Sequence, residues 1–150
     1  MKLTAKKIAE YFLFKTDTEV EDYISNLKLQ KLVYYAQGFH LAIHGKPLFN
    51  DKIVAWTHGP VVENLYHEYK KHGPKTIEPP SEIDFSIYDK RVTELLDDVW
   101  DVYGQYSALR LRNLTHEEEP WIEAYRKMPG SEISQKTMER YFKTLLADAE

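Results

Sequence analysis

The chain of 150 residues contains no cysteine. This absence excludes disulfides, thiolate zinc sites, iron–sulfur clusters and a cysteine nucleophile. Long hydrophobic runs are also missing, because the longest covers only residues 32–36, whereas a membrane-spanning helix needs about 20 apolar residues. The first residues lack the apolar region of a signal peptide. We therefore expect a cytoplasmic protein with no membrane contact.

What the chain does contain is typical of a globular protein. Hydrophobic residues make up 43% and charged residues 29% of the sequence. A chain of this length can bury about two-thirds of its surface, so we expect one compact domain over residues 1–150. Residues 1–75 carry 11 Lys/Arg and 8 Asp/Glu, whereas residues 76–150 carry 9 and 16. The acidic second half suits a basic protein partner better than a nucleic acid.

Apolar residues recur at helical spacing along most of the chain, which predicts a mainly α fold with six or seven helices. We expect the first helix after Thr4, followed by a polar connection over residues 15–21. The second should begin at an Asn26 cap and end at Gly45. The run over residues 53–56 predicts a short β segment. The later helices are expected to begin at Pro60, Asp89, Ser107, Pro120 and Ser134.

The predicted helix over residues 26–45 is apolar on two sides. Leu29, Val33 and Ala36 belong to one broad arc, and a second stripe consists of residues spaced by seven. A helix of this kind is typical of the centre of a bundle, which is the interpretation we favour. The alternative is that the second stripe receives a protein partner. Candidates for partner contact are the stripe residues Leu27, Tyr34 and Leu41, the neighbouring Tyr35, which we expect to be exposed, and Lys28.

Four acidic residues fall on one face of the helix predicted after Asp89: Glu94, Asp97, Asp98 and Asp101. Residues 97–101 match the DDxxD pattern that holds magnesium and diphosphate in isoprenoid enzymes. The acids lie opposite the apolar residues of the same helix, where a solvated face belongs. We therefore favour a surface role. Because like charges one turn apart are unfavourable, a basic partner would stabilise this face.

Two patterns raise the question of metal or acid–base chemistry. His40 and His44 are one turn apart, a spacing that suits zinc, but the sequence shows no third ligand. We favour a buried, hydrogen-bonded His40 and keep a metal hydrolase as an alternative. His116 precedes the acidic run 117–119, which we interpret as a charged helix start. With no complete catalytic set, we expect no enzyme activity, no cofactor and no bound metal.

A nucleic-acid-binding regulator is the alternative from another functional class. The cations that would serve it are Arg110, Arg112, Arg126 and Lys127. They flank the acidic run 117–119, whose negative charge offsets the positive charge that nucleic-acid binding would need. Nucleic-acid binding is therefore the less favoured hypothesis.

Three segments are more specific than these patterns. They are LKLQKLVYYAQG at residues 27–38 with GKPLF at 45–49, AWTHGPVV at 55–62, and LTH at 114–116 with Pro120-Trp121 and residues 138–142. In this order and spacing the chain resembles the Panacea-domain family, also described as SocA-like or GepA-like phage-associated proteins. The motif residues are Gln30, Lys31, Trp56, Gly59, Pro60, Thr115, His116, Pro120 and Trp121.

The resemblance implies an antitoxin, because members of this family neutralise toxins, commonly by binding the toxin protein. The expected partner is a cognate toxin encoded by a neighbouring gene. A SocA-type member instead acts as an adaptor that delivers its toxin to a AAA+ protease, and this is the alternative mechanism. His58 departs from the family, which usually has an aromatic residue before the Gly-Pro pair. We expect the turn to survive, since Gly59 and Pro60 are present.

Overall fold

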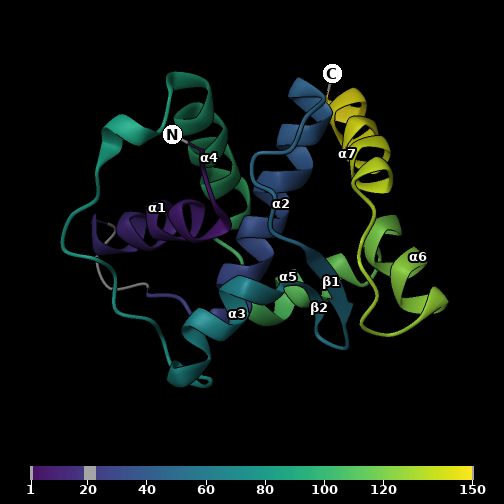
Figure 1. Cartoon of the computed structure of the whole chain (residues 1–150), viewed down its shortest axis with the longest axis horizontal. Helices are drawn as coiled ribbons and strands as arrows, with labels where there is room; N and C mark the ends of the chain where they lie inside the picture. Colours follow the sequence, from purple (N-terminus) through teal and green to yellow (C-terminus); the bar gives the residue numbers. More distant parts are fainter. Residues whose placement is uncertain (1, 19–22, 150) are drawn as a thin grey trace.

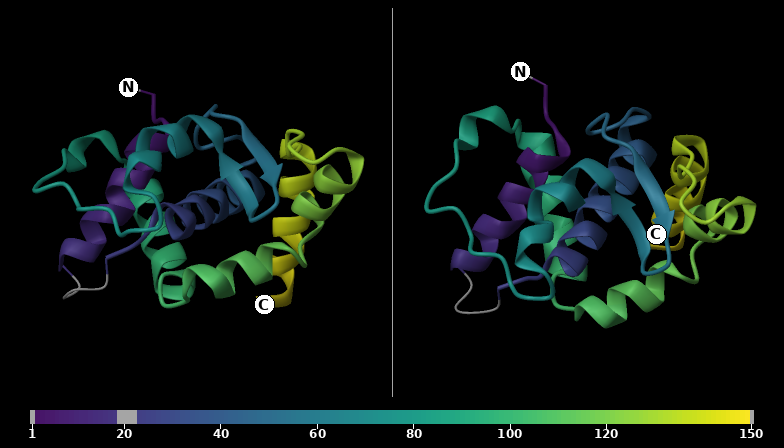
Figure 2. Two further views of the ribbon diagram at one scale, coloured as in Figure 1. Left: turned by 90° about the horizontal axis from the view of Figure 1, so that it is seen from below. Right: turned by 60° about the horizontal axis from the view of Figure 1, so that its bottom comes forward.

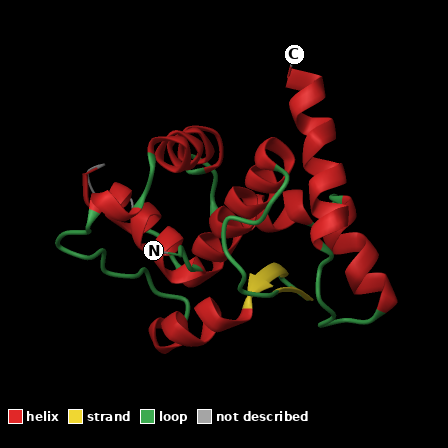
Figure 3. Ribbon diagram, turned by 45° about the horizontal axis from the view of Figure 1, so that its top comes forward, coloured by secondary structure: helices red, strands yellow, loops and turns green. Residues whose placement is uncertain are grey.

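The computed structural model describes residues 2–18 and 23–149. Within those ranges the chain is mainly helical, with one hairpin of two short strands, as predicted (Figure 3). The elements are α1 (Ala5–Thr18), α2 (Asn26–His44), β1 (Ile53–Trp56), β2 (Gly59–Val62), α3 (Glu63–Tyr69), α4 (Lys90–Tyr103), α5 (Ala108–Thr115), α6 (Glu119–Lys127) and α7 (Gln135–Ala149). Short 3-10 turns follow α3 and precede α4.

Helix α2 runs through the middle of the molecule (Figure 1). Helices α1 and α4 lie on one side of it and α7 on the other, and α5 and the hairpin also contact it. Fourteen of its 19 residues are buried, which confirms the interpretation as a central helix. In the second apolar stripe Tyr34 and Leu41 are core residues and Leu27 is half-buried. The stripe is therefore mostly covered by the protein itself.

The predicted helix starts hold for most helices, because side-chain caps form there. Ser107 accepts a hydrogen bond from the Arg110 backbone N–H at 3.1 Å, and Ser134 accepts one from Thr137. The cap of α2 is Ser25 rather than Asn26, which lies one residue inside the helix. The equivalent side chains for α1 and α4 are Thr4 and Asp89.

Two predicted boundaries are wrong. Residues 15–18, expected in a connection, continue helix α1, and residues 19–21 of that connection lie outside the described residues. Pro60, expected to open the third helix, lies in β2 opposite Ala55, and α3 begins at Glu63. Proline is tolerated there because β2 is an edge strand: its partner β1 bonds on its other edge to residues 131–133, and no further strand among the described residues needs a backbone N–H from Pro60.

The hairpin connects the central helix to α6. Strand β2 faces α2 and strand β1 faces α6 (Figure 2). On its other edge β1 bonds to the loop between α6 and α7, where the Ala55 N–H donates to the Ser131 carbonyl at 2.9 Å. The hairpin therefore lies between α2 and α6 and contacts both.

The close packing of α7 on α2 depends on Gly38. A Cβ atom at this position would lie 2.2 Å from the ring of Phe142, which is fully buried. Glycine is therefore required for the helices to approach so closely. None of the described helices is long and apolar enough to cross a bilayer.

Candidate functional site

Helix α2 carries a row of buried polar side chains that bond to other elements. The Gln30 side chain accepts a hydrogen bond from the Val62 backbone N–H at 2.8 Å, which holds the end of β2 against α2. The Lys28 ammonium donates to the Gly104 carbonyl at 2.6 Å, at the end of α4. From the sequence, Lys28 is a candidate for partner contact and Gln30 a motif residue, and both are buried. In the folded chain they join elements of the scaffold.

Lys31 is the most deeply buried cation of this row. Its ammonium donates to the Pro60 carbonyl at 3.1 Å, and its side chain has no exposed surface. Gly59, with φ of 110°, leaves the space, because a Cβ there would lie 2.8 Å from both Lys31 Cε and Thr115 Oγ1. Burial, together with the nearby Arg112 guanidinium, lowers the pKa of Lys31 to about 7. At the hairpin turn the structure thus brings together four motif residues: Lys31, Gly59, Pro60 and Thr115.

Glu118 joins the start of α6 to α2. Its two carboxylate oxygens accept hydrogen bonds from the hydroxyls of Tyr34 at 3.1 Å and Tyr35 at 2.9 Å. Burial raises the pKa of Glu118 to about 7, although both tyrosine hydrogen bonds act to lower it. The same burial, with the adjacent carboxylate, raises the pKa of each tyrosine above its usual value.

The prediction that Tyr35 is exposed is therefore wrong. Its side chain is 0% exposed, and its ring stacks on Tyr103 with centroids 3.9 Å apart. Tyr34 is also fully buried. Although Tyr34 and Tyr35 are adjacent on α2 and leave the helix in different directions, the Glu118 carboxylate bonds to both hydroxyls. Neither ring presents surface to a partner in this structure.

The two motif tryptophans meet where α6 packs on the hairpin. Trp121 donates a hydrogen bond from its indole nitrogen to the Trp56 carbonyl at 2.8 Å. The His116 ring stacks on Trp121 with centroids 4.2 Å apart. Burial, with the Arg112 charge, lowers the pKa of His116. Pro120 is buried in the first turn of α6, as its helix-start role predicts.

His40 is a buried, hydrogen-bonded histidine, as the favoured interpretation predicts. Its Nδ1 lies 2.7 Å from the Lys46 carbonyl oxygen, and burial lowers its pKa. His44 lies beside it, with ring centroids 4.7 Å apart. Within residues 2–18 and 23–149 no group of three His, Asp or Glu side chains is placed to hold a metal ion.

The acidic residues of α4 separate into two environments. Asp97 is half-buried, accepts a hydrogen bond from the Tyr11 hydroxyl at 2.7 Å and lies 3.3 Å from the Lys15 ammonium. Asp98 and Asp101 are exposed and make no side-chain hydrogen bond or ion pair with any residue that the structure describes. Glu94 is exposed and weakly paired with Lys90 at 3.9 Å. The acidic groups of α4 without an ion-pair partner among the described residues are therefore Asp98 and Asp101.

An apolar groove of about 400 Å³ lies beside these acids, between α4 and α7 and above the end of α2. Two of its apolar residues are open to solvent, since Ile43 is 50% and Val102 49% exposed. Asp98 is the one charged residue among those described that line it. Only packing reveals this groove, because three helices far apart in sequence contribute to it. Its lining consists of Phe39, Ile43, Leu95, Asp98, Val99, Val102, Tyr103, Leu145 and Leu146.

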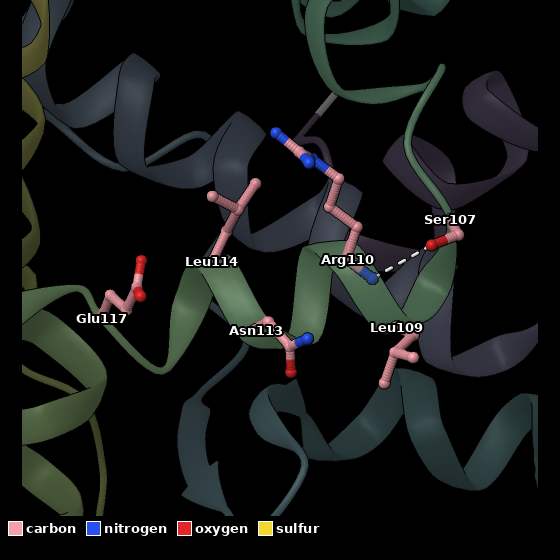
Figure 4. A pocket seen from close by; sticks show the side chains of 6 residues that line it. All are labelled: Ser107, Leu109, Arg110, Asn113, Leu114 and Glu117. Atoms are coloured by element: carbon pink, nitrogen blue, oxygen red, sulfur yellow. Dashed lines mark hydrogen bonds between the residues drawn. The ribbon is translucent and has the colours of Figure 1, made fainter.

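A second, shallower pocket of about 440 Å³ follows one exposed side of α5 (Figure 4). Arg110 in its lining lies over the Tyr106 ring, with its guanidinium carbon 4.6 Å from the centroid. Arg112 donates to His58 at 3.2 Å. The other two cations of the predicted basic patch, Arg126 and Lys127, belong to α6 and lie in a separate pocket with acidic neighbours. The four cations do not gather on one element.

A family model described as "Antitoxin SocA-like, Panacea domain" matches residues 29–122, more than half of the chain. The chain belongs to this family. The matched segment contains the pairs Lys31–Pro60, Tyr34–Glu118 and Trp56–Trp121 described above. The Panacea-domain motif residues are thus largely the contacts that join α2 to the hairpin, α5 and α6.

Among curated proteins, the antitoxin SocA of Caulobacter vibrioides (strain NA1000 / CB15N) is 48% identical over 54 residues. The aligned segment covers 36% of this chain and 29% of SocA, so it spans less than a third of that protein. No solved structure matches the chain.

Glu118 is the site residue that sequence reasoning missed, because it stands between two exposed glutamates in the run 117–119. The sequence does indicate that a helix begins near Pro120, so one glutamate of the run is expected to face α2 at this helix start. The sequence alone does not tell which of the three turns inward.

Proposed function

We propose that this protein is a cytoplasmic antitoxin that neutralises a cognate toxin by binding it directly in a stoichiometric complex. Membership of the antitoxin SocA-like, Panacea domain family supports the general function. The observation that carries the binding mode is the exposed acidic side of α4 beside an apolar groove. Charged and apolar surface side by side is what a specific protein interface requires.

We propose that the protein catalyses no reaction. The groups with strongly shifted pKa values, Lys31 and Glu118, are buried and bonded to neighbouring elements. A reacting group needs access to substrate, and Lys31 has no exposed surface. Their arrangement supports a role in holding the fold.

The proposed toxin contact is the exposed acidic surface formed by Glu94, Asp98 and Asp101. Asp97, included in the candidate surface from sequence, is engaged with Tyr11 and supports the packing of α1 on α4 instead. Toxins that act on RNA or nucleotides carry basic groups at their active sites, and these would complement the exposed acids. Lys28, Tyr34, Tyr35 and Leu41 are buried, so we do not retain them in the proposed contact.

The test is co-expression with the product of the adjacent gene, scored for rescue of growth, followed by mixing of the two purified proteins. We expect rescue, a one-to-one complex and loss of toxin activity with no protease present. Rescue in cells without inhibition of the purified toxin supports the alternative adaptor mechanism. Absence of both rescue and complex would overturn the proposed function.

We further propose that residues 1–150 form one Panacea-like domain. Helices α1 and α7 lie outside the matched segment 29–122, yet both pack on α2. Elements that share one core are expected to unfold together.

A further inference from the structure

We propose that the groove between α4 and α7 binds a basic amphipathic helix of the partner protein. This inference rests on the proposed function, because it names the part of the toxin that the antitoxin holds. The C-terminal ends of α2 and α7 lie side by side at one end of the molecule, and α4 lies across α2 from α7 (Figure 1). Residues of all three helices line the groove.

The shape of the lining suits a helix. On α4, Leu95, Val99 and Val102 repeat at positions i, i+4 and i+7, so they form a ridge along one face. Leu145 and Leu146 form the opposite wall, and residues of α2 form the floor. A partner helix that places apolar residues at i, i+3 or i+4 and i+7 would pack its own ridge between these walls.

The apolar lining of the groove is partly open to solvent. Ile43 and Val102, half exposed on α2 and α4, both line the groove. Contiguous apolar surface with a polar rim marks interaction sites on soluble proteins. A volume of about 400 Å³ admits a few large side chains, as helix-in-groove recognition requires.

The charges at the groove select a basic occupant. Asp98 lies in the lining and Asp101 is one turn further along α4, and neither has an ion-pair partner among the described residues. The lysine near Leu146 on α7, Lys143, is paired with Glu139 at 2.9 Å. Lysine or arginine on the flanks of a partner helix would complement the free acids, whereas phosphates and anionic lipids would be repelled.

A second copy of this chain fits the groove less well. In a symmetric dimer the same patch of both subunits forms the interface, so Asp98 and Asp101 of both copies would lie in it together, with no cation among the described residues of the groove lining to offset them. Like charges at an interface core are unfavourable. The occupant is therefore assigned to a different, basic chain.

The probe is a fluorescent synthetic 16-residue helix with leucine at positions i, i+4, i+7 and i+11 and lysine on its other face. Its controls are the same peptide with glutamate in place of lysine and a scrambled lysine peptide. With the full chain, anisotropy titration should show the lysine helix binding at least ten-fold more tightly than either control. Equal binding of the three peptides would overturn the inference.

The matched variants are Val102→Lys and Ile43→Lys in the groove and Leu109→Lys on α5. Leu109 is 61% exposed at the start of α5 and lies in the shallow pocket rather than in the groove, so it controls for a lysine added to an exposed apolar position (Figure 4). We expect each groove variant to weaken peptide binding at least ten-fold at unchanged melting temperature, and Leu109→Lys to leave it within two-fold. Equal losses in all three variants, or none in the groove variants, contradict the proposal. Sedimentation showing that the groove variants dissociate a homodimer would assign the groove to a second copy instead.

Co-expression with the toxin separates this inference from the proposed function. If wild type rescues growth and Val102→Lys rescues equally well, the groove assignment fails while the antitoxin function stands. If wild type itself gives no rescue and no complex, the antitoxin function fails.

Discussion

The ammonium group of Lys31 lies 3.1 Å from the carbonyl oxygen of Pro60, inside the protein and out of contact with water. This hydrogen bond ties the central helix to the hairpin. The lysine pKa falls from 10.5 to about 7 because burial disfavours the charge. Between these two values the unfolded chain holds a proton that the folded chain has released, so folding stability rises with pH.

We expect Lys31→Met to remove this rise. In wild type, the free energy of unfolding should gain on the order of 2–3 kcal/mol from Lys31 between pH 7 and 9, at about 1.4 kcal/mol per pH unit. Urea unfolding at both pH values measures it, with the exposed Lys52→Met as the control. A variant with the same pH dependence as wild type would show that Lys31 does not titrate as described.

Glu118 should produce the opposite dependence at lower pH. Its pKa is raised from 4.5 to about 7, so the folded chain holds the extra proton between these values and stability falls as pH rises. We expect Glu118→Gln to abolish a loss on the order of 3 kcal/mol between pH 4.5 and 7. The control is Glu82→Gln, an exposed glutamate. Denaturant midpoints that change in parallel in wild type and Glu118→Gln would refute this.

Gly38→Ala should destabilise the packing of α7 on α2. The added Cβ would lie 2.2 Å from the Phe142 ring, and overpacking of this kind costs on the order of 1–3 kcal/mol. Phe142→Leu shortens the side chain that the methyl group meets. In that background Gly38→Ala should therefore cost less than in wild type, as a double-mutant cycle of thermal unfolding measures. Additive effects would mean that the two residues do not collide.

Reversal of the exposed acids of α4 should slow association with the toxin. We expect the triple variant Glu94→Lys, Asp98→Lys and Asp101→Lys to lower the association rate constant about 10-fold or more at low salt, since complementary charge steers encounter. Asp97 is kept, because its bond to Tyr11 is part of the fold. The control reverses three exposed glutamates elsewhere, at positions 78, 82 and 132. Equal rates for the two triple variants, measured by stopped flow, remove this surface from the proposed interface.

The regular parts of the fold were predictable because their signals are local. Helical spacing and caps such as Ser107 and Ser134 involve residues only three or four positions apart, so they can be recognised directly in the sequence. Pro60 was misplaced because proline suits both a first helical turn and an outer strand. In the structure Pro60 pairs with Ala55 as a strand residue, and the other edge of β1 bonds to residues 131–133, more than 70 positions away in the sequence.

The sequence by itself determined the family, the mainly helical class and the acidic character of α4, because each rests on residue identity and spacing along the chain. Only the tertiary structure decided which polar residues face inward. Tyr35 and Glu118 are separated by 83 positions, yet they share a hydrogen bond of 2.9 Å, and Asp97 turns to Tyr11 while Asp98 remains in solvent. A polar side chain is buried where a distant partner satisfies it, and the position of that partner is set by packing.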